Sequence, residues 1–471
     1  MDRTALKTFV ATLWDKEAVP TLSRYIRIPN LSPMFDPKWE ANGHMDKAMA
    51  LFAAWATKKV KKLKGAKVEV LRPKGRTPLL TVDIPGTGAG RVLMYGHMDK
   101  QPGVTGWYDW TGPWKPAIKG GKLYGRGGAD DGYSLFAGLT AVLALADQHL
   151  PYPRTFVIIE ACEESGSTDL IFYIDKLARR IGTPDLVVVL DSGCGNYDQL
   201  WLTTSLRGIA AGTLSVQVLK EGVHSGDAGG VVPSSFRILR ELLSRIENEK
   251  TGAIKLESCA VEVPADRMAQ AEACAAVLGD AVSSRMPFAG KTGPMGKKPL
   301  DRVLNRTWRA QLAVIAIDGY PKPAEAGNVL LPETVAKLSL RLPPTADAAK
   351  ALKEMKRTLT ADPPYDAKVS FATEAAEAGW NAPALPAWLE ETLDEASKAH
   401  FGAPLAAMGD GGAIPLLAEL SRRFPAAQFL VTGVLGPKSN AHGPNEFLHI
   451  GAAKNISAAT AEALAALAAK K

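Results

Sequence analysis

The chain has 471 residues, of which 46% are hydrophobic and 22% are charged. These proportions exclude a disordered or low-complexity protein, and the length favours two folded domains over one. The formal net charge of +7 is modest for this length and does not by itself indicate a nucleic-acid-binding protein.

The N-terminal residues do not resemble a targeting segment. Charged side chains interrupt any signal-peptide core in residues 1–22, and no later window has the 18 or so apolar residues of a membrane span. The four cysteines form no CxxC pair, which favours reduced thiols. We therefore expect a cytoplasmic protein with no membrane partner.

Much of the positive charge lies in residues 58–76, where lysine and arginine alternate with apolar residues. This pattern predicts an amphipathic helix that runs into a strand, with lysine stems covering its edge. No aromatic residues that could stack on bases are interleaved with the charges. We therefore expect no nucleic-acid partner.

Short apolar runs alternate with helical patterns in the first 200 residues. The predicted strands cover residues 67–72, 79–84, 91–99, 154–161 and 185–193, and a predicted helix covers residues 133–150. This alternation is typical of an α/β fold with a mixed, largely parallel sheet and helices on both faces. Glycine-rich residues 86–90 precede a strand rather than a helix, so they predict a hairpin turn and not a dinucleotide-binding loop.

The pattern changes after residue 207. Residues 212–222, 335–344 and 367–373 alternate strictly between apolar and polar, as half-exposed antiparallel strands do, and residues 233–248 predict a helix. The α/β pattern returns with a predicted helix at 385–401 and a strand at 426–434. We therefore expect a discontinuous catalytic domain, residues 1–207 and 379–471, that carries an inserted α+β domain, residues 208–378.

Titratable side chains follow several predicted strands. His97 and Asp99 lie two residues apart and project from the same face of a strand, so Asp99 is placed to accept the second ring proton of a metal-bound His97. Taken alone, this pair is also typical of a structural or simple surface contact. Asp130 and Asp131 lie in a glycine-dense loop that enters a helix, which indicates either a cation site or a helix cap.

Adjacent carboxylates end another buried strand, at Glu163 and Glu164. Their mutual repulsion would raise a pKa unless a cation neutralises at least one of them. Asp191 ends the next strand, and His442 lies in a loop after the last one. Together the chain offers nitrogen and oxygen ligands for two transition-metal ions, with zinc the usual catalytic choice: His97, Asp130, Glu164, Asp191 and His442.

The ordered motifs HxD, GRGxxD, EESGS, a strand-end aspartate and AHGPNE resemble the di-zinc metallopeptidase family. That family includes carnosinase-type dipeptidases, glutamate carboxypeptidase, aminoacylase and succinyl-diaminopimelate desuccinylase, and the resemblance covers essentially the whole chain. The segments EESGS and GDGGAIP are similar to the carnosinase-like dipeptidase branch. The resemblance implies a zinc-peptidase catalytic domain with an inserted lid and dimerisation domain.

Roles for the metal-site residues follow from the resemblance. It implies two Zn²⁺ ions per subunit, with Mn²⁺ or Co²⁺ as substitutes, and a bridging Asp130. His97 and Asp191 would complete one site, and Glu164 and His442 the other.

Further roles are implied around the metal ions. Glu163 would be the general base, and Asp99 would orient His97. His224, in EGVHSGDAGG, would reach the active site of the neighbouring subunit and stabilise the oxyanion there, which implies a homodimer.

Four residues match family positions that contact substrate: Arg341, Asn328, Gly411 and Gly412. The chain also departs from the family pattern. Gly132 and Tyr133 replace the lysine and glycine of the common DxKG sequence, and neither lost residue is a metal ligand. Ala413 replaces a serine, which removes a hydroxyl contact to substrate and leaves the exact substrate open.

The implied reaction is hydrolysis of the amide bond next to the free C-terminal carboxylate of a dipeptide or short peptide. The positive net charge suggests a preference for acidic residues. Closure of the inserted domain, at hinges near residues 207 and 379, would exclude water. An N-acyl amino acid amidohydrolase or desuccinylase is the alternative enzyme. An inactive scaffold of the same fold is disfavoured because all five ligands and the base are present.

Overall fold

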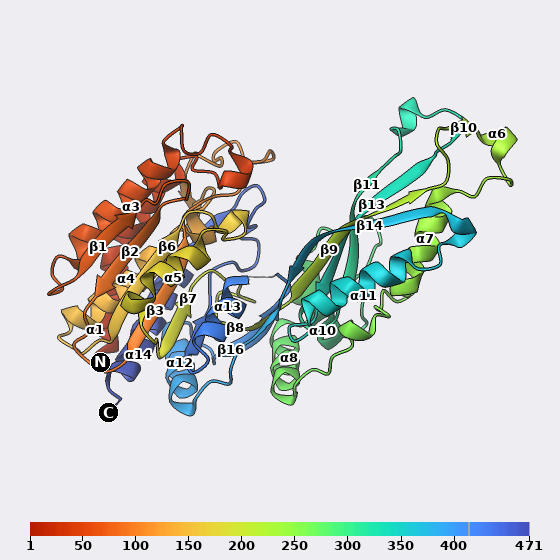
Figure 1. Cartoon of the computed structure of the whole chain (residues 1–471). Coiled ribbons are helices and arrows are strands. Elements are labelled where there is room, and N and C mark those ends of the chain that lie inside the picture. The colour runs from red at the N-terminus through yellow and green to blue at the C-terminus, as the bar shows by residue number, and fades with distance from the viewer. Residues whose placement is uncertain (413–414, 471) are drawn as a thin grey trace.

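The computed structural model describes residues 1–412 and 415–470. Figure 1 shows two lobes, one built from the two ends of the chain and the other from its middle. No helix within the described ranges is both long and apolar enough to cross a membrane.

The larger lobe is built on a six-stranded sheet with the order β1-β2-β6-β3-β7-β17. In that order the strands are Lys67–Leu71, Leu79–Ile84, Arg154–Glu160, Arg91–His97, Leu186–Val189 and Gln428–Val431. The last four run parallel, whereas β1 and β2 pair antiparallel at one edge. The predicted mixed, largely parallel sheet is confirmed.

Helices cover both faces of this sheet because successive strand residues point to opposite sides. On one face Val82, Met94 and Val157 pack against helices from the N-terminal and C-terminal parts of the chain. These helices are α1 (Arg3–Leu13), α2 (Val19–Ile26), α3 (His44–Val60), α4 (Ser134–Asp147), α12 (Ala387–His400) and α14 (Ile450–Ala468). On the other face Leu93 and Phe156 pack against α5 (Leu170–Ile181) and α13 (Pro415–Arg423).

The turn predicted at residues 86–90 is not a hairpin, and that prediction is wrong. Strand β6 lies between β2 and β3 in the sheet, so the chain crosses over β6 in this segment. A hairpin would need the two flanking strands to be hydrogen-bonded neighbours. The long-range pairing of β6 with both strands overrides the local turn signal.

The smaller lobe contains a four-stranded antiparallel sheet with the order β11-β13-β9-β14. Its strands are Gln311–Asp318, Glu333–Leu342, Gly208–Gln217 and Lys368–Glu377, and the helices α7 (Ser235–Ile246) and α11 (Ala348–Thr360) pack on it. This core is separate from those of the larger lobe. The predicted α+β insert is present, and we propose boundaries at residues 208 and 378, because β9 begins at Gly208 and β14 ends at Glu377.

Two further small sheets, β15-β8-β16 and β18-β5-β4, accompany the large one. Their strands are Trp380–Asn381, Trp201–Leu206 and Ala406–Asp410 in the first, and Phe447–His449, Lys122–Tyr124 and Ala117–Lys119 in the second. The remaining short elements are β10 (Val223–His224), α6 (Ser225–Ala228), α9 (Ala281–Ser284) and β12 (Val329–Leu330). Strand β8 leads directly into β9, so it links the two lobes.

Sequence patterns did not predict the helical excursion formed by α8 (Ala265–Leu278) and α10 (Pro299–Thr307). Although it belongs to the middle of the chain, it packs against Trp201 and Met408 of the larger lobe. The Arg267 guanidinium donates to Asn381 Oδ1 at 2.7 Å, which anchors α8 beside β15. Consequently α8 and α10 hold the two lobes together next to the point where β8 leads into β9.

Glu462 joins three helices of the larger lobe. Arg3 Nε donates to Glu462 Oε1 at 2.9 Å, and His400 Nε2 lies 2.7 Å from the same oxygen. We expect Glu462→Gln to lower the free energy of unfolding by about 1–3 kcal/mol at neutral pH, because charged hydrogen bonds of a largely buried carboxylate are lost. Glu395→Gln, which removes an exposed partner of Arg3, should change it by less than about 0.5 kcal/mol.

The effect of Glu462→Gln should depend on pH. Burial opposes the shift, but hydrogen bonds with His400 and Arg3 lower the pKa of Glu462 below its ordinary value. A carboxyl with a lowered pKa stabilises the fold above its unfolded-state pKa, and this stability is lost as the pH falls through the folded-state value. Urea titrations at several pH values should therefore show the difference between wild type and variant shrinking in acid, and a constant difference would contradict this assignment.

Candidate metal centre

The first ligand group forms around His97 at the end of β3, in the interior of the larger lobe. His97 Nε2 lies 3.1 Å from Asp130 Oδ1 and 3.6 Å from Asp191 Oδ2. All three side chains are buried. Strand β3 positions His97, the loop before α4 positions Asp130, and Asp191 follows β7, so strand ends converge as expected for a parallel sheet.

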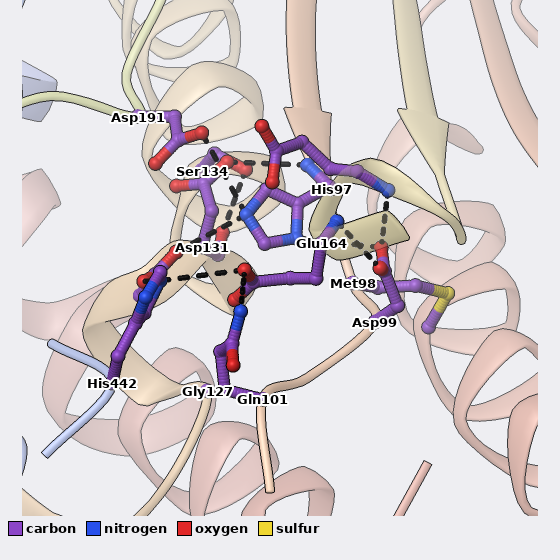
Figure 2. A network of polar contacts seen from close by, with 12 residues as sticks. His97, Met98, Asp99, Gln101, Gly127, Asp131, Ser134, Glu164, Asp191 and His442 are labelled. Atoms are coloured by element: carbon purple, nitrogen blue, oxygen red, sulfur yellow. Dashed lines mark hydrogen bonds and ion pairs between the residues drawn. The ribbon is translucent and has the colours of Figure 1, made fainter. Parts of the chain in front are cut away.

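The second ligand group shares Asp130 with the first. His442 Nε2 lies 3.0 Å from Asp130 Oδ2 and 3.3 Å from Glu164 Oε2. The two oxygens of Asp130 therefore face different histidines, His97 and His442. Figure 2 shows Glu164 and His442 on one side of the cluster, with Asp191 beyond the His97 ring.

The spacing of these atoms fits transition-metal binding. Zinc binds histidine nitrogen and carboxylate oxygen at about 2.0–2.2 Å, so two tetrahedral ligands lie roughly 3.4 Å apart. The four nitrogen–oxygen distances in the two groups run from 3.0 to 3.6 Å. Within each group, the ligand atoms lie within 4.8 Å of one another. The five residues thus fit two cations that share Asp130.

The pKa shifts indicate a site with excess negative charge. Burial raises the pKa of Asp191 to about 7, and the carboxylates of Asp130 and Glu164 contribute to the rise. Burial would lower the pKa of His442, but its hydrogen bonds with Asp130 and Glu164 raise it to about 11. Bound cations would relieve this repulsion between the carboxylates.

Asp99 supports both the histidine and the glutamate pair. Its carboxylate accepts hydrogen bonds from the backbone N–H groups of Glu163 and Glu164, at 3.1 and 3.0 Å. Asp99 Oδ1 also lies 3.5 Å from His97 Nδ1. One carboxylate therefore binds the turn at Glu163 and Glu164 and faces the His97 ring, while the orienting role of Asp99 stays a prediction.

Glu163 lies beside the ligand groups without belonging to either of them. Burial raises the pKa of Glu163 well above its ordinary value; His97 opposes the rise, whereas the carboxylates of Asp191 and Glu164 add to it. A carboxyl with a raised pKa next to a metal site is suited to accept and return a proton.

A buried ion pair that sequence reasoning missed holds the His442 loop. Arg126 Nη1 donates to Glu446 Oε2 at 2.5 Å, and Arg126 Nη2 donates to the carbonyl oxygens of His442 and Gly443 at 2.9 and 3.0 Å. Both charged side chains are buried. They belong to the GRGxxD and AHGPNE motifs, so the signal was present, but the motifs alone do not reveal that their non-ligand residues pair with each other.

Other polar contacts also steady the ligands. Gln101 Nε2 donates to Glu164 Oε2 at 2.6 Å, and Asp131 accepts from the backbone N–H of His97 at 3.2 Å. Tyr133, one of the departures from the family pattern, donates its hydroxyl to the carbonyl oxygen of Leu190, directly before Asp191. This replacement therefore supports a ligand-bearing strand end.

The predicted substrate-contacting residues lie in three places. His224 and Asn328 are exposed, where β10 pairs with β12 at the far tip of the smaller lobe, distant from the metal-site cluster (Figure 1). The structure thus does not bring His224 to the metal centre of its own chain. Arg341 lies on β13 opposite Ile209, close to the start of β9, where the chain passes from one lobe to the other.

Gly411 and Gly412 follow β16, where Gly412 N donates to Asp410 Oδ1 at 3.2 Å. Their contact with a substrate carboxylate stays a prediction. Ala413, the predicted departure from the family serine, lies outside the described residues.

A mixed sheet that brings two paired ligand groups together at its strand ends defines the class of this protein as a metal-dependent hydrolase. The model of Peptidase family M20/M25/M40 matches residues 93–470, so the chain belongs to that family. It is a metallopeptidase, a hydrolase that acts on peptide bonds.

The curated relatives include dipeptidases from distant organisms. A cysteinylglycine-S-conjugate dipeptidase of Corynebacterium striatum is 26% identical over 396 residues, which cover 82% of this chain and 83% of that protein. The human Beta-Ala-His dipeptidase is 27% identical over 274 residues, or 57% of this chain and 53% of that protein.

Solved structures share the whole fold. The human carnosine dipeptidase 1 has a TM-score of 0.77 at 20% identity, covering 99% of this chain and 98% of that one. The dipeptidase Dug1p of Saccharomyces cerevisiae has a TM-score of 0.78 at 21% identity, covering 100% of this chain and 99% of that one. This similarity confirms the predicted fold, an α/β domain that carries an inserted α+β domain; the lid and dimerisation roles of the insert stay predictions.

Proposed function

We propose that this chain hydrolyses dipeptides or short peptides at the amide bond next to the free C-terminal carboxylate, using two zinc ions and Glu163 as the general base. The observation that carries the proposal is the placement of Asp130 between two ligand groups, with Glu163 beside both. We assign the ligands as predicted: His97 and Asp191 at one ion, Glu164 and His442 at the other.

Bound metal ions would supply Lewis acidity and lower the pKa of water in the site toward about 7. Glu163 would take the proton of the attacking water and return it to the leaving amine. Its carboxylate is available for this role because Glu163 belongs to neither ligand group. Asp99 would keep His97 in the ligating orientation through its contact with Nδ1.

We further propose that the chain forms a homodimer in which His224 completes the active site of the partner subunit. In support, His224 is exposed at the lobe tip and lies far from the metal-site residues of its own chain (Figure 1). The edge strand β11 also exposes apolar side chains at Val314, Ile315 and Ile317. An exposed apolar edge strand is a ready surface for pairing with a second copy.

Subunit complementation tests this arrangement. We expect Glu163→Gln and His224→Ala homodimers each to be nearly inactive, while a mixture with exchanged subunits regains activity. A mixed dimer contains one site with both native residues, so random exchange should restore roughly a quarter of the wild-type rate, given that an oxyanion donor and a general base each contribute about 10²-fold or more. Recovery near zero after verified exchange would place His224 outside the partner's site.

Relatives suggest the substrate class. Two of them are named as dipeptidases for cysteinylglycine conjugates and Beta-Ala-His, and we propose dipeptides as substrates here. The net charge of +7 is what supports our proposed preference for acidic residues. Succinyl-diaminopimelate desuccinylase of Methylobacillus flagellatus is 30% identical over 133 residues, which keeps the N-acyl amidohydrolase as the second candidate.

Four buried, unpaired cysteines support the proposed cytoplasmic location.

A rate comparison separates these candidates. Zinc-loaded protein is incubated with dipeptides, tripeptides and N-acetyl or N-succinyl amino acids, and products are followed by mass spectrometry. Faster release of amino acids from dipeptides supports the proposal. Faster cleavage of N-acyl substrates would replace it with the amidohydrolase, and no cleavage of any substrate would favour an inactive scaffold.

A further inference from the structure

A groove on the larger lobe contains none of the metal-site residues. It is lined by α1, by the end of α3 with the turn that follows it, and by the end of α4. Its volume is about 1160 Å³, which exceeds the roughly 300–1,000 Å³ of a small-molecule pocket. Figure 1 shows these three helices on the side of the larger lobe that faces away from the smaller lobe. The groove can therefore receive a macromolecule without involving the junction of the lobes.

The groove follows one face of α1 and of the helical turn after it. The lining residues Asp2, Ala5, Phe9, Leu13 and Lys16 are three or four residues apart, so their side chains lie in one row. This row is roughly 20 Å long, because a helix rises about 1.5 Å per residue. A long groove beside a helix is the shape that a second helix fills.

Apolar side chains form the bottom of the groove. Leu13, Leu63 and Leu143 are 8%, 5% and 8% exposed, and Phe9 is half-buried beside them. These side chains are recessed, whereas a membrane-binding surface carries apolar side chains that insert into the lipid. The bottom of the groove therefore favours an occupant with a protruding apolar stripe, such as one face of an amphipathic helix.

One end of the groove is basic. The lysines that line it are Lys16, Lys58, Lys59 and Lys62. Glu17 forms an ion pair with Lys59 and lies 3.9 Å from Lys58, which places the end of α3 beside the last turn along α1. Across the described ranges, Glu17 is the carboxylate found within 4.0 Å of any of these lysines. Positive charge therefore exceeds negative charge at this end.

The other end of the groove is acidic. The backbone N–H of Asp2 donates to Gln148 Oε1 at 3.0 Å, and Gln148 Nε2 donates to the carbonyl oxygen of Asp2 at the same distance. This exchange brings Asp2 next to the exposed Asp147, and both aspartates line the groove. The groove thus has acidic and basic ends separated by the length of α1.

We propose that this groove binds an amphipathic helix of a partner protein, oriented antiparallel to α1. Helices are stabilised by acidic side chains in the first turn and basic side chains in the last turn. In the antiparallel orientation, the acidic first turn of the partner meets the lysines, and its basic last turn meets Asp2 and Asp147. Its apolar stripe then covers Phe9 and the three recessed leucines.

A pair of probe peptides tests this surface. The first is an 18-residue capped peptide with leucines at helical spacing, glutamates in its first turn and lysines in its last turn, and the second has these charges exchanged. By fluorescence anisotropy, wild type should bind the first peptide with a micromolar Kd and the second at least about 10-fold more weakly, because several charge pairs change sign together.

Charge reversal in the protein should invert this preference. The double variant Lys58→Glu with Lys62→Glu should bind the first peptide about 10-fold more weakly than wild type and the second more tightly. Lys353→Glu, on an exposed position of α11 in the smaller lobe, should leave both affinities unchanged. Unchanged zinc-dependent dipeptide hydrolysis by the double variant would show that it is folded.

Three results would overturn the proposal: no measurable binding of either peptide, equal affinity for the two, or affinities that the double variant does not change. Vesicles of phosphatidylserine and phosphatidylcholine provide a separate arm. Vesicle binding that the double variant loses, without binding of the first peptide, would assign the lysines to a membrane surface and would also overturn the helix-binding groove.

Discussion

Replacing Glu163 with glutamine should lower kcat by roughly 10²- to 10⁴-fold, because the group that accepts and returns the proton is lost. The substitution keeps the size of the side chain, and Glu163 is in neither ligand group. The variant should therefore bind two zinc ions per subunit, measured by elemental analysis of dialysed protein, while its rate on a dipeptide collapses.

Glu164→Gln is the matched control for this experiment. Glu164 lies 3.3 Å from His442 Nε2 within the second ligand group, so this variant should lose zinc as well as activity. If Glu163→Gln lost zinc and Glu164→Gln retained it, the assignment of base and ligand would have to be exchanged. A Glu163→Gln variant with near-normal kcat would remove Glu163 from the reaction.

Breaking the buried pair of Arg126 and Glu446 should have the largest effect on stability. We expect Arg126→Met to lower the free energy of unfolding by about 3–5 kcal/mol, because it leaves the Glu446 carboxylate buried without its partner. It should also release the backbone of His442, which Arg126 holds through a hydrogen bond of 2.9 Å. Urea unfolding should show the destabilisation, and elemental analysis should show less than two zinc ions per subunit.

A second variant distinguishes the loss of the pair from a general loss of packing. Adding Glu446→Leu to Arg126→Met removes the unpaired charge, so the double variant should be more stable than Arg126→Met alone. Zinc binding at the second ligand group should stay weak, because the His442 loop still lacks its anchor. A double variant less stable than either single one would mean that packing, rather than the unpaired charge, dominates.

Local patterns predicted much of the large sheet and the metal-site residues. Near-continuous apolar runs identified β3, β6 and β7, and a candidate ligand lies at the end of each strand or within four residues after it: His97, Glu164 and Asp191. The convergence of His97 and Asp191 follows from a general property of parallel sheets, whose carboxyl strand ends share one edge. The pairing of ligands across Asp130 came from resemblance to a family, because spacing along a chain does not fix distances in space.

Features that depend on long-range packing escaped prediction. The crossover at residues 86–90 was mistaken for a hairpin because the turn residues say nothing about β6, which follows some 60 residues later. The docking of the helices α8 and α10 on Trp201 is visible only in three dimensions. The same docking brings Arg306 Nη2 to 3.7 Å from Asp410 Oδ1, a contact that no sequence pattern indicated.

The most direct test of the central claim is a zinc titration of metal-stripped protein with dipeptide hydrolysis as the readout. Two ligand groups that share Asp130 predict no hydrolysis without metal and a rate that rises until two equivalents of zinc are bound. Hydrolysis by the metal-free protein, or a rate that is complete at one equivalent and unchanged by the second, would contradict a two-metal peptidase.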